Sequence, residues 1–179
     1  EDVFSNKDLR KLIIPLVIEQ LLAVTIGMAD TVMVSSCGEA AVSGISLVDS
    51  INFLLITLFS SLATGGAVIA SQYIGRGDHK SASLAAKQLF YASLALSAVL
   101  GIIAVFFRKP VLNMVFGSIE ADVMAHAQIY FLLSAISYPF LAVYNAGAAL
   151  FRSMGDSRTT MLISILMNTI NIVGNAILI

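Results

Sequence analysis

Charged side chains are scarce in this chain of 179 residues: they make up 12% of it, whereas hydrophobic residues make up 58%. Soluble domains carry about 25% charged residues, so this sequence lacks the polar surface that water requires. The mean hydropathy of +0.92 agrees with that deficit. The composition therefore excludes an ordinary soluble domain and predicts an all-α, polytopic membrane protein in contact with the lipid bilayer.

Cysteine and net charge are also nearly absent. The single cysteine, Cys37, excludes a disulfide within the chain. The formal net charge of −1 leaves no basic excess, so we expect no nucleic-acid partner. We find no nucleophile elbow, no P-loop and no metal-ligand cluster in the sequence. We therefore expect no enzyme, no catalytic residue and no organic cofactor.

Long apolar runs are what the sequence contains instead. A bilayer core about 30 Å thick needs roughly 20 mostly apolar helical residues to cross it. Five transmembrane helices are predicted, at about residues 10–34, 42–72, 82–107, 122–151 and 159–179. After the third helix, Pro110 is expected to prevent helix continuation, and a short apolar segment is expected to follow along the membrane interface.

The distribution of positive charge predicts the orientation. With a cytoplasmic N-terminus, eight of the ten cations fall on the inner side, and only Arg108 and Lys109 fall outside. The inner cations are Lys7, Arg10, Lys11, Arg76, Lys80, Lys87, Arg152 and Arg158. The sequence therefore predicts a multi-pass protein of the cell membrane. The absent initiating Met and the final apolar run "NIVGNAILI" suggest a piece of a longer protein.

A short pattern recurs at two inner helix ends. "YIGRGD" (73–78) and "FRSMGD" (151–156) share an aromatic residue, three further residues and Gly-Asp. Two interpretations stay open. The pattern is a trace of internal duplication, or it is a common signal that stops one helix and caps the next.

Two carboxylates stand within the first apolar run. An acid inside a spanning helix costs roughly 2.5–3.5 kcal/mol on insertion scales, so it usually serves a function. Glu19 and Asp30 are predicted to lie within roughly 20° of each other on one helix face and about 16 Å apart. No cation lies within the apolar part of any predicted helix to neutralise Asp30. Glu19 is either functional or paired and silent; Gln20 adds polarity beside it.

A polar stripe follows in the fifth helix, where Ser164, Asn168, Asn171 and Asn175 occur at helical spacing. Asn171 and Asn175 are expected at a depth similar to that of Asp30. If this stripe faces the acidic face of the first helix, the Asp30 carboxylate is flanked by amide oxygens. Such a set of oxygen ligands suits a hard cation or a proton.

Other polar groups are predicted to line a substrate cavity. Asp49, with Ser46, Ser50 and Asn52 around it, is one candidate, and a capping or interfacial role stays open for it. Tyr138 faces a cavity or packs. Asn168 fits interhelical hydrogen bonding better than ligand binding. Glycines, including Gly44 and Gly65-Gly66, favour close helix approach.

The sequence resembles the multidrug and toxic compound extrusion (MATE) transporters. The resemblance rests on three ordered stretches, "PLVIEQLLAVTIGMADTVMVSSCGEAAVSGISLVDSINFLL", "GGAVIASQYIGRGD" and "FRSMGDSRTTMLISILMNTINIVGNAILI". It implies a parent with twelve spanning helices in two six-helix lobes. This chain, residues 1–179, is then the N-terminal lobe, truncated before a sixth helix, and the C-terminal lobe of the same parent is its partner.

The resemblance also implies an activity, the expulsion of organic cations and drugs in exchange for Na⁺ or H⁺. The family's first-helix aspartate corresponds to Asp30, and its fifth-helix polar positions correspond to Asn171 and Asn175. Some members carry an aspartate where this chain has Asn175, so the coupling ion stays open. If it is Na⁺, Asp30 and Asn171 are the expected ligands. Glu19 occurs in some branches and is a second candidate acid.

Two alternatives remain beside the antiporter. A lipid-linked oligosaccharide flippase of the same superfamily shares the helix pattern, but it is expected to carry more cations in its cavity to bind a pyrophosphate. A non-transporting helical membrane subunit uses its polar stripes only for packing. An Asp30→Leu substitution separates the subunit from both transporters.

Overall fold

The computed structural model describes the chain as five helices. It describes the backbone of residues 6–36 and 38–178, whereas the side chains of Asp30, Met33, Asn171 and residues 174–178 lie outside the description. The helices are α1 Asn6–Ser35, α2 Glu39–Gly75, α3 His79–Phe116, α4 Ala121–Ser153 and α5 Ser157–Leu178. No strand occurs among the described residues, which confirms the all-α prediction.

Four of these helices are long and apolar enough to cross a membrane over their described residues. They are α2, α3, α4 and the part of α1 from Asn6 to Ala29. Helix α5 is not among the four. Its side chains are described without a gap only up to Ile170. On α1 the apolar side chains of Ile13, Leu21 and Val32 are exposed, as expected for a surface that faces lipid rather than a protein core.

Helix α3 continues beyond the predicted end of its span, because the chain bends before Pro110 rather than stopping there. Phe107 has non-helical φ and ψ angles of −113° and 21°, and the following residues return to a helical conformation up to Phe116. A proline clashes with the carbonyl four residues before it in a continuous helix. The bend at Phe107 separates Pro110 from that turn, so Pro110 lies near the start of the new helical segment, where its missing N–H costs little.

The two Gly-Asp patterns form the same connector. At each, a glycine with positive φ ends one helix, Gly77 at 75° and Gly155 at 82°. In each, the aspartate N–H bonds the carbonyl of the aromatic residue five positions earlier, Asp78 to Tyr73 and Asp156 to Phe151. This is the Schellman arrangement, in which glycine avoids the steric cost of a side chain.

Each aspartate then caps the next helix. Asp78 accepts the backbone N–H of Ser81, and Asp156 accepts both the N–H and the hydroxyl of Thr159. Side-chain and backbone hydrogen bonds from Ser81 hold the pKa of Asp78 below its ordinary value, and those from Thr159 do the same for Asp156. The helix-stop and cap interpretation therefore accounts for the repeated pattern.

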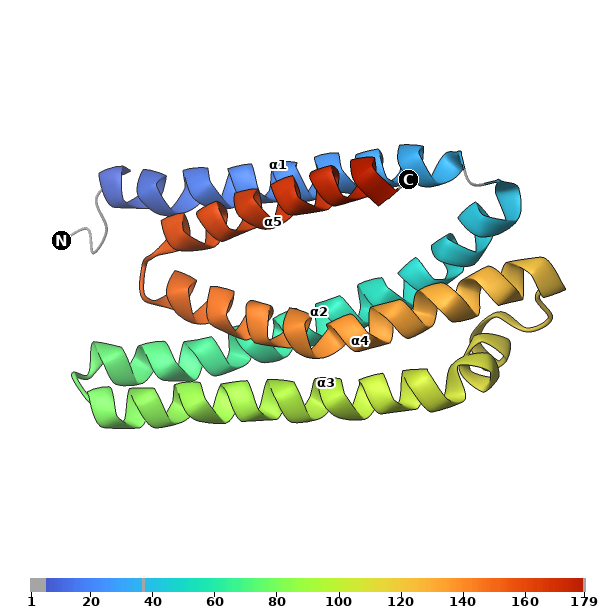
Figure 1. The fold of residues 1–179 in the computed structure, drawn as a ribbon. Coiled ribbons are helices and arrows are strands. Elements are labelled where there is room, and N and C mark those ends of the chain that lie inside the picture. Colours follow the sequence, from blue (N-terminus) through green and yellow to red (C-terminus); the bar gives the residue numbers. More distant parts are fainter. Residues whose placement is uncertain (1–5, 37, 179) are drawn as a thin grey trace. The chain divides into compact units, whose positions relative to one another are not determined.

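The helices group into two compact units. One unit comprises residues 1–36 and 151–179, and the other comprises residues 37–150. In the first, α1 and α5 lie side by side although they are far apart in sequence (Figure 1). In the second, α2 and α3 lie side by side, and the part of α4 up to Leu150 packs with them around a shared core (Figure 1).

The core of residues 37–150 is built from aromatic and small side chains. Phe59 and Tyr138 meet edge to face, with their ring centroids 6.2 Å apart. Gly44 brings α2 close to the backbone of α4, because a Cβ at this position would lie 2.8 Å from the Val123 carbonyl oxygen and 2.9 Å from the Ala127 nitrogen. The expected close approach therefore occurs at Gly44; at Gly65, by contrast, a Cβ would meet no atom within 4 Å.

Candidate functional site

The predicted coupling residues lie on the paired helices α1 and α5. Asp30 belongs to α1, and Asn171 and Asn175 belong to α5. The packing of α1 against α5 brings together the two helices that the coupling prediction requires. The side chains of these three residues lie outside the described part of the structure, so their grouping stays a prediction.

The other predicted residues of this unit differ in burial. Gln20 is exposed on α1, and Asn168 is half-buried on α5. Ser164, one turn before Asn168, is buried. No hydrogen bond joins Asn168 to another residue of the described part of the chain, so neither its packing role nor its substrate role gains support from a contact.

Glu19 forms an ion pair with Arg152. The arginine Nη1 lies 3.3 Å from Oε1 and 3.4 Å from Oε2 of the glutamate, so one donor contacts both carboxylate oxygens. The exposed fraction is 11% for the Glu19 side chain and 30% for that of Arg152. A carboxylate this far removed from solvent is stabilised by an opposite charge. The paired interpretation of Glu19 therefore has a named partner, at the last turn of α4.

A polar network joins α2 to α4 around Asp49. The Tyr130 hydroxyl donates to Asp49 Oδ1 at 2.8 Å, and Asn52 Nδ2 makes a longer contact with the same oxygen at 3.5 Å. Helix α2 begins at Glu39, so Asp49 lies about 15 Å along it and does not cap it. The capping role left open for Asp49 is therefore wrong, whereas the interfacial role stays a prediction; the structure shows a carboxylate held by neighbouring donors.

Asn52 connects this carboxylate to the core. Its Nδ2 also donates to Ser134 Oγ at 3.1 Å, while its Oδ1 accepts the Tyr138 hydroxyl at 2.9 Å. Tyr138 is 1% exposed, so its ring packs and only its hydroxyl takes part in the network. The structure therefore supports the packing interpretation of Tyr138 and not the cavity-facing one: the ring is a core side chain, and its hydroxyl bonds the Asn52 amide of α2.

Three residues that contact the polar groups described above were not predicted as site residues: two belong to the Asp49 network, and the third, Arg152, pairs with Glu19 outside it. Tyr130, Ser134 and Arg152 carried no signal of their own in the sequence. The spacing of Tyr130, Ser134 and Tyr138 at i, i+4 and i+8 places them on one face of α4, and Asn52 follows Asp49 by three residues on α2. A search for polar residues at matching helical spacing on two neighbouring helices would have found the network.

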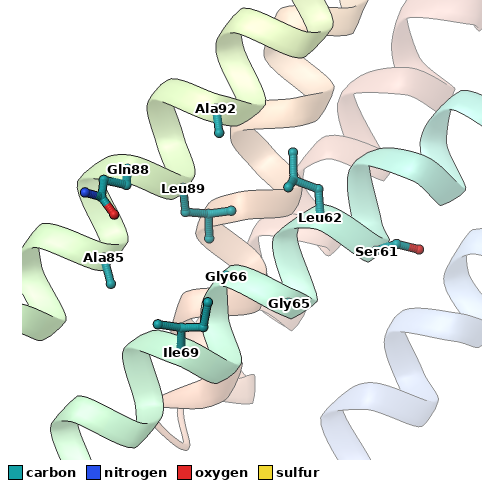
Figure 2. Close-up of a pocket in the computed structure, with 9 residues that line it drawn as sticks. All are labelled: Ser61, Leu62, Gly65, Gly66, Ile69, Ala85, Gln88, Leu89 and Ala92. Atoms are coloured by element: carbon teal, nitrogen blue, oxygen red, sulfur yellow. The ribbon is translucent and has the colours of Figure 1, made fainter.

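A shallow groove lies elsewhere, between α2 and α3, with a volume of about 440 Å³ (Figure 2). Its walls are small and mostly apolar, and Ser61 and Gln88 are its polar members (Figure 2). Leu89 lies over Gly66, where a Cβ would come within 2.6 Å of the leucine. The groove contains no carboxylate, and it does not include Asp49 or Tyr138. Among the described residues, no three His, Cys, Asp or Glu side chains gather to hold a metal ion.

Comparison with known proteins identifies the family. Residues 15–177 match the MatE family. The chain is 34% identical over 173 residues to the uncharacterized transporter YisQ of Bacillus subtilis, covering 92% of this chain and 36% of that protein. It is 29% identical over 172 residues to a probable multidrug resistance protein NorM of Thermotoga maritima, covering 93% and 36%. The chain thus spans little more than a third of these relatives.

Solved structures share the fold. A multidrug resistance MATE family transporter in an outward-facing conformation matches with a TM-score of 0.87 at 22% identity, over 96% of this chain and 38% of that one. A MOP superfamily transporter from Pyrococcus furiosus, described as having a binding pocket of reversed polarity, matches with a TM-score of 0.80 at 25% identity. That match covers 96% of this chain and 37% of the other. The apolar helices and the family match together support a multi-pass membrane protein.

Proposed function

Because this chain belongs to the MatE family of membrane transporters, we propose that it is the N-terminal lobe of a cation-coupled multidrug efflux antiporter. The single observation that carries the proposal is the family match over residues 15–177, which includes both helices of the predicted coupling site. The substrates are organic cations or drugs, and the C-terminal lobe of the same parent chain completes the transporter. Alternating access then moves the substrate outward across the cell membrane, with the N-terminus in the cytoplasm.

In this proposal Asp30 is the coupling carboxylate. It takes Na⁺ or H⁺ from the outside, assisted by Asn171 and Asn175, and for Na⁺ the ligands are Asp30 and Asn171. Neutralising the carboxylate lowers the cost of transferring it into an apolar environment, so the helices around it repack and substrate is released. Coupling requires the ion and the substrate to favour different conformational states.

The remaining predicted residues have secondary roles. Glu19 is a second acid, whose charge Arg152 balances in the structure described here. Asp49, Gln20 and Asn168 are each assigned to substrate contact, whereas the buried Tyr138 is not, because its ring packs in the core and its hydroxyl bonds Asn52. The flippase alternative gains no support from these relatives, which are named as transporters and multidrug resistance proteins.

Dye efflux from vesicles tests the proposal. The full-length transporter that carries this sequence is reconstituted, and efflux of a cationic dye is followed under a Na⁺ gradient and, separately, under a pH gradient. We expect one gradient to drive efflux. Asp30→Asn should abolish that efflux, because the asparagine side chain has no negative charge that Na⁺ or H⁺ could neutralise. The gradient that drives efflux names the coupling ion.

A matched control is Glu39→Gln, which removes one exposed carboxylate at the start of α2. It should transport as the wild type does. Ion-driven efflux that persists in Asp30→Asn would overturn the role of Asp30. Failure of both gradients to move dye in the wild type would overturn the antiporter itself.

A further inference from the structure

Asp49 is an unneutralised acid within an apolar helix. It lies in α2, one of the helices long and apolar enough to span a membrane. No Lys, Arg or His of the described part of the chain forms an ion pair with it. Ionisable residues at such positions are costly and usually bind something, because an unbalanced charge is unfavourable there. Glu19 has Arg152 as its cation, whereas no described cation of these helices balances Asp49, so its carboxylate is open to a positively charged ligand.

The carboxylate is oriented by its neighbours. Both contacts that it receives, from Tyr130 and from Asn52, go to Oδ1. The other oxygen, Oδ2, accepts no hydrogen bond from the described residues, and the Asp49 side chain is exposed. One oxygen is therefore fixed on the protein and the other remains available to a ligand. A fixed acceptor loses less conformational entropy on binding than a freely rotating one.

The orienting groups are themselves fixed. Ser134 and the buried Tyr138 hold the two ends of the Asn52 amide, so the amide has a defined direction. The close approach of α2 and α4 at Gly44 keeps the two helices near enough for these bonds. The network thus extends from the core to a single exposed carboxylate.

The chemistry favours an organic cation over a metal ion. Hard metal cations take six or more oxygen ligands, often several of them charged, and Asp49 is the only carboxylate among the network residues that the structure describes. A large organic cation is weakly hydrated, and it needs one opposite charge together with apolar and aromatic surroundings.

We propose that Asp49, oriented by Tyr130 and Asn52, is the carboxylate that binds the positive group of an organic cation substrate. This inference rests on the proposed efflux function and assigns substrate recognition to a residue other than the coupling acid Asp30. Tyr130 and Asn52 are positioning residues, since they act through the carboxylate.

Equilibrium binding without any ion gradient tests the inference. The purified full-length transporter is titrated with tetraphenylphosphonium by calorimetry. Asp49→Asn should weaken binding about tenfold, while Glu39→Gln, on the same helix, should stay within about twofold of the wild type. Tyr130→Phe removes one hydrogen bond and keeps the charge, so it should weaken binding about threefold. Binding by Tyr130→Phe should still fall as salt is raised, whereas binding by Asp49→Asn should lose most of that salt dependence.

The outcomes separate the two proposals. Wild-type affinity in Asp49→Asn, or equal losses in Asp49→Asn and Glu39→Gln, overturns the role of Asp49 and leaves the efflux function standing. If Asp49→Asn does not fold, Tyr130→Phe decides, and unchanged affinity there overturns the inference. Absence of binding by a wild-type protein that transports other substrates overturns the organic-cation assignment. Loss of gradient-driven efflux in Asp30→Asn bears only on coupling.

Discussion

The carboxylate of Glu19 lies 3.3 Å from an arginine guanidinium, whereas the carboxylate of Asp49 is held by a tyrosine hydroxyl and an amide. Both acids belong to long apolar helices, and both are costly there. The first is nearly buried and its charge is balanced within its own unit. The second is exposed, and it is balanced by no described cation. Carboxylates of similar cost are thus paired with a cation in one unit and held only by neutral donors in the other.

The largest effect should come from breaking the ion pair. Arg152→Met leaves the Glu19 carboxylate without its cation, and removing one partner of a buried pair costs about 3 kcal/mol. Thermal unfolding of the purified protein in detergent measures the loss. Arg158→Met, which removes an exposed arginine in the first turn of α5, is the control and should change little.

A second variant checks the cause of that loss. Adding Glu19→Gln to Arg152→Met also removes the charge that Arg152 balanced, and most of the lost stability should return. If the single and double variants unfold alike, the arginine acts through its packing rather than through its charge, and the contrast with Asp49 is lost.

A smaller loss of stability should follow from forcing α2 and α4 apart at Gly44, near the Asp49 network. Gly44→Ala places a Cβ against two backbone atoms of α4, which have no flexible side chain to move aside. We expect a destabilisation of about 2 kcal/mol, measured by thermal unfolding. Gly65→Ala is the matched control on the same helix; it meets no atom within 4 Å and should be neutral or slightly stabilising. Equal effects of the two variants would argue against close packing at Gly44.

The smallest loss of stability should follow from removing one hydrogen bond of the Asp49 network without altering its charge. Tyr138→Phe keeps the buried ring and removes the donor to Asn52 Oδ1, at a cost of about 1 kcal/mol. Tyr91→Phe, at a tyrosine that is 73% exposed, is the control and should unfold at the wild-type temperature. A Tyr138→Phe protein as stable as the wild type would show that Asn52 needs no such donor.

The apolar runs of the sequence were enough to predict the helices, but not which helices pack together. Runs of apolar residues predicted five helices close to their observed positions, because apolar length is a local property. The expectation that Pro110 prevents helix continuation was wrong, because the backbone bends at Phe107 and then continues as helix to Phe116. The Gly-Asp connectors were readable, since each is formed by residues close together in the chain.

Contacts between residues far apart in the chain could not be predicted from the sequence in this way. Glu19 and Arg152 are separated by 133 positions, and nothing in either local sequence specifies the other. The Arg152 side chain was assigned to an inner connector, although it reaches an acid of α1. Asp49 was recognised because an acid in an apolar run is conspicuous. Its donors were not, because tyrosine and serine are ordinary residues in such helices until the neighbouring helix is known.

The connector between α2 and α3 bears on how the chain is made. All of its hydrogen bonds join residues between Gln72 and Ala82, so it requires no other part of the protein. All partners of this turn are therefore present once these residues have left the ribosome. Helices α2 and α3 can then enter the lipid together as a hairpin, with the Asp78 carboxylate already hydrogen-bonded at the turn, before α4 has been synthesised.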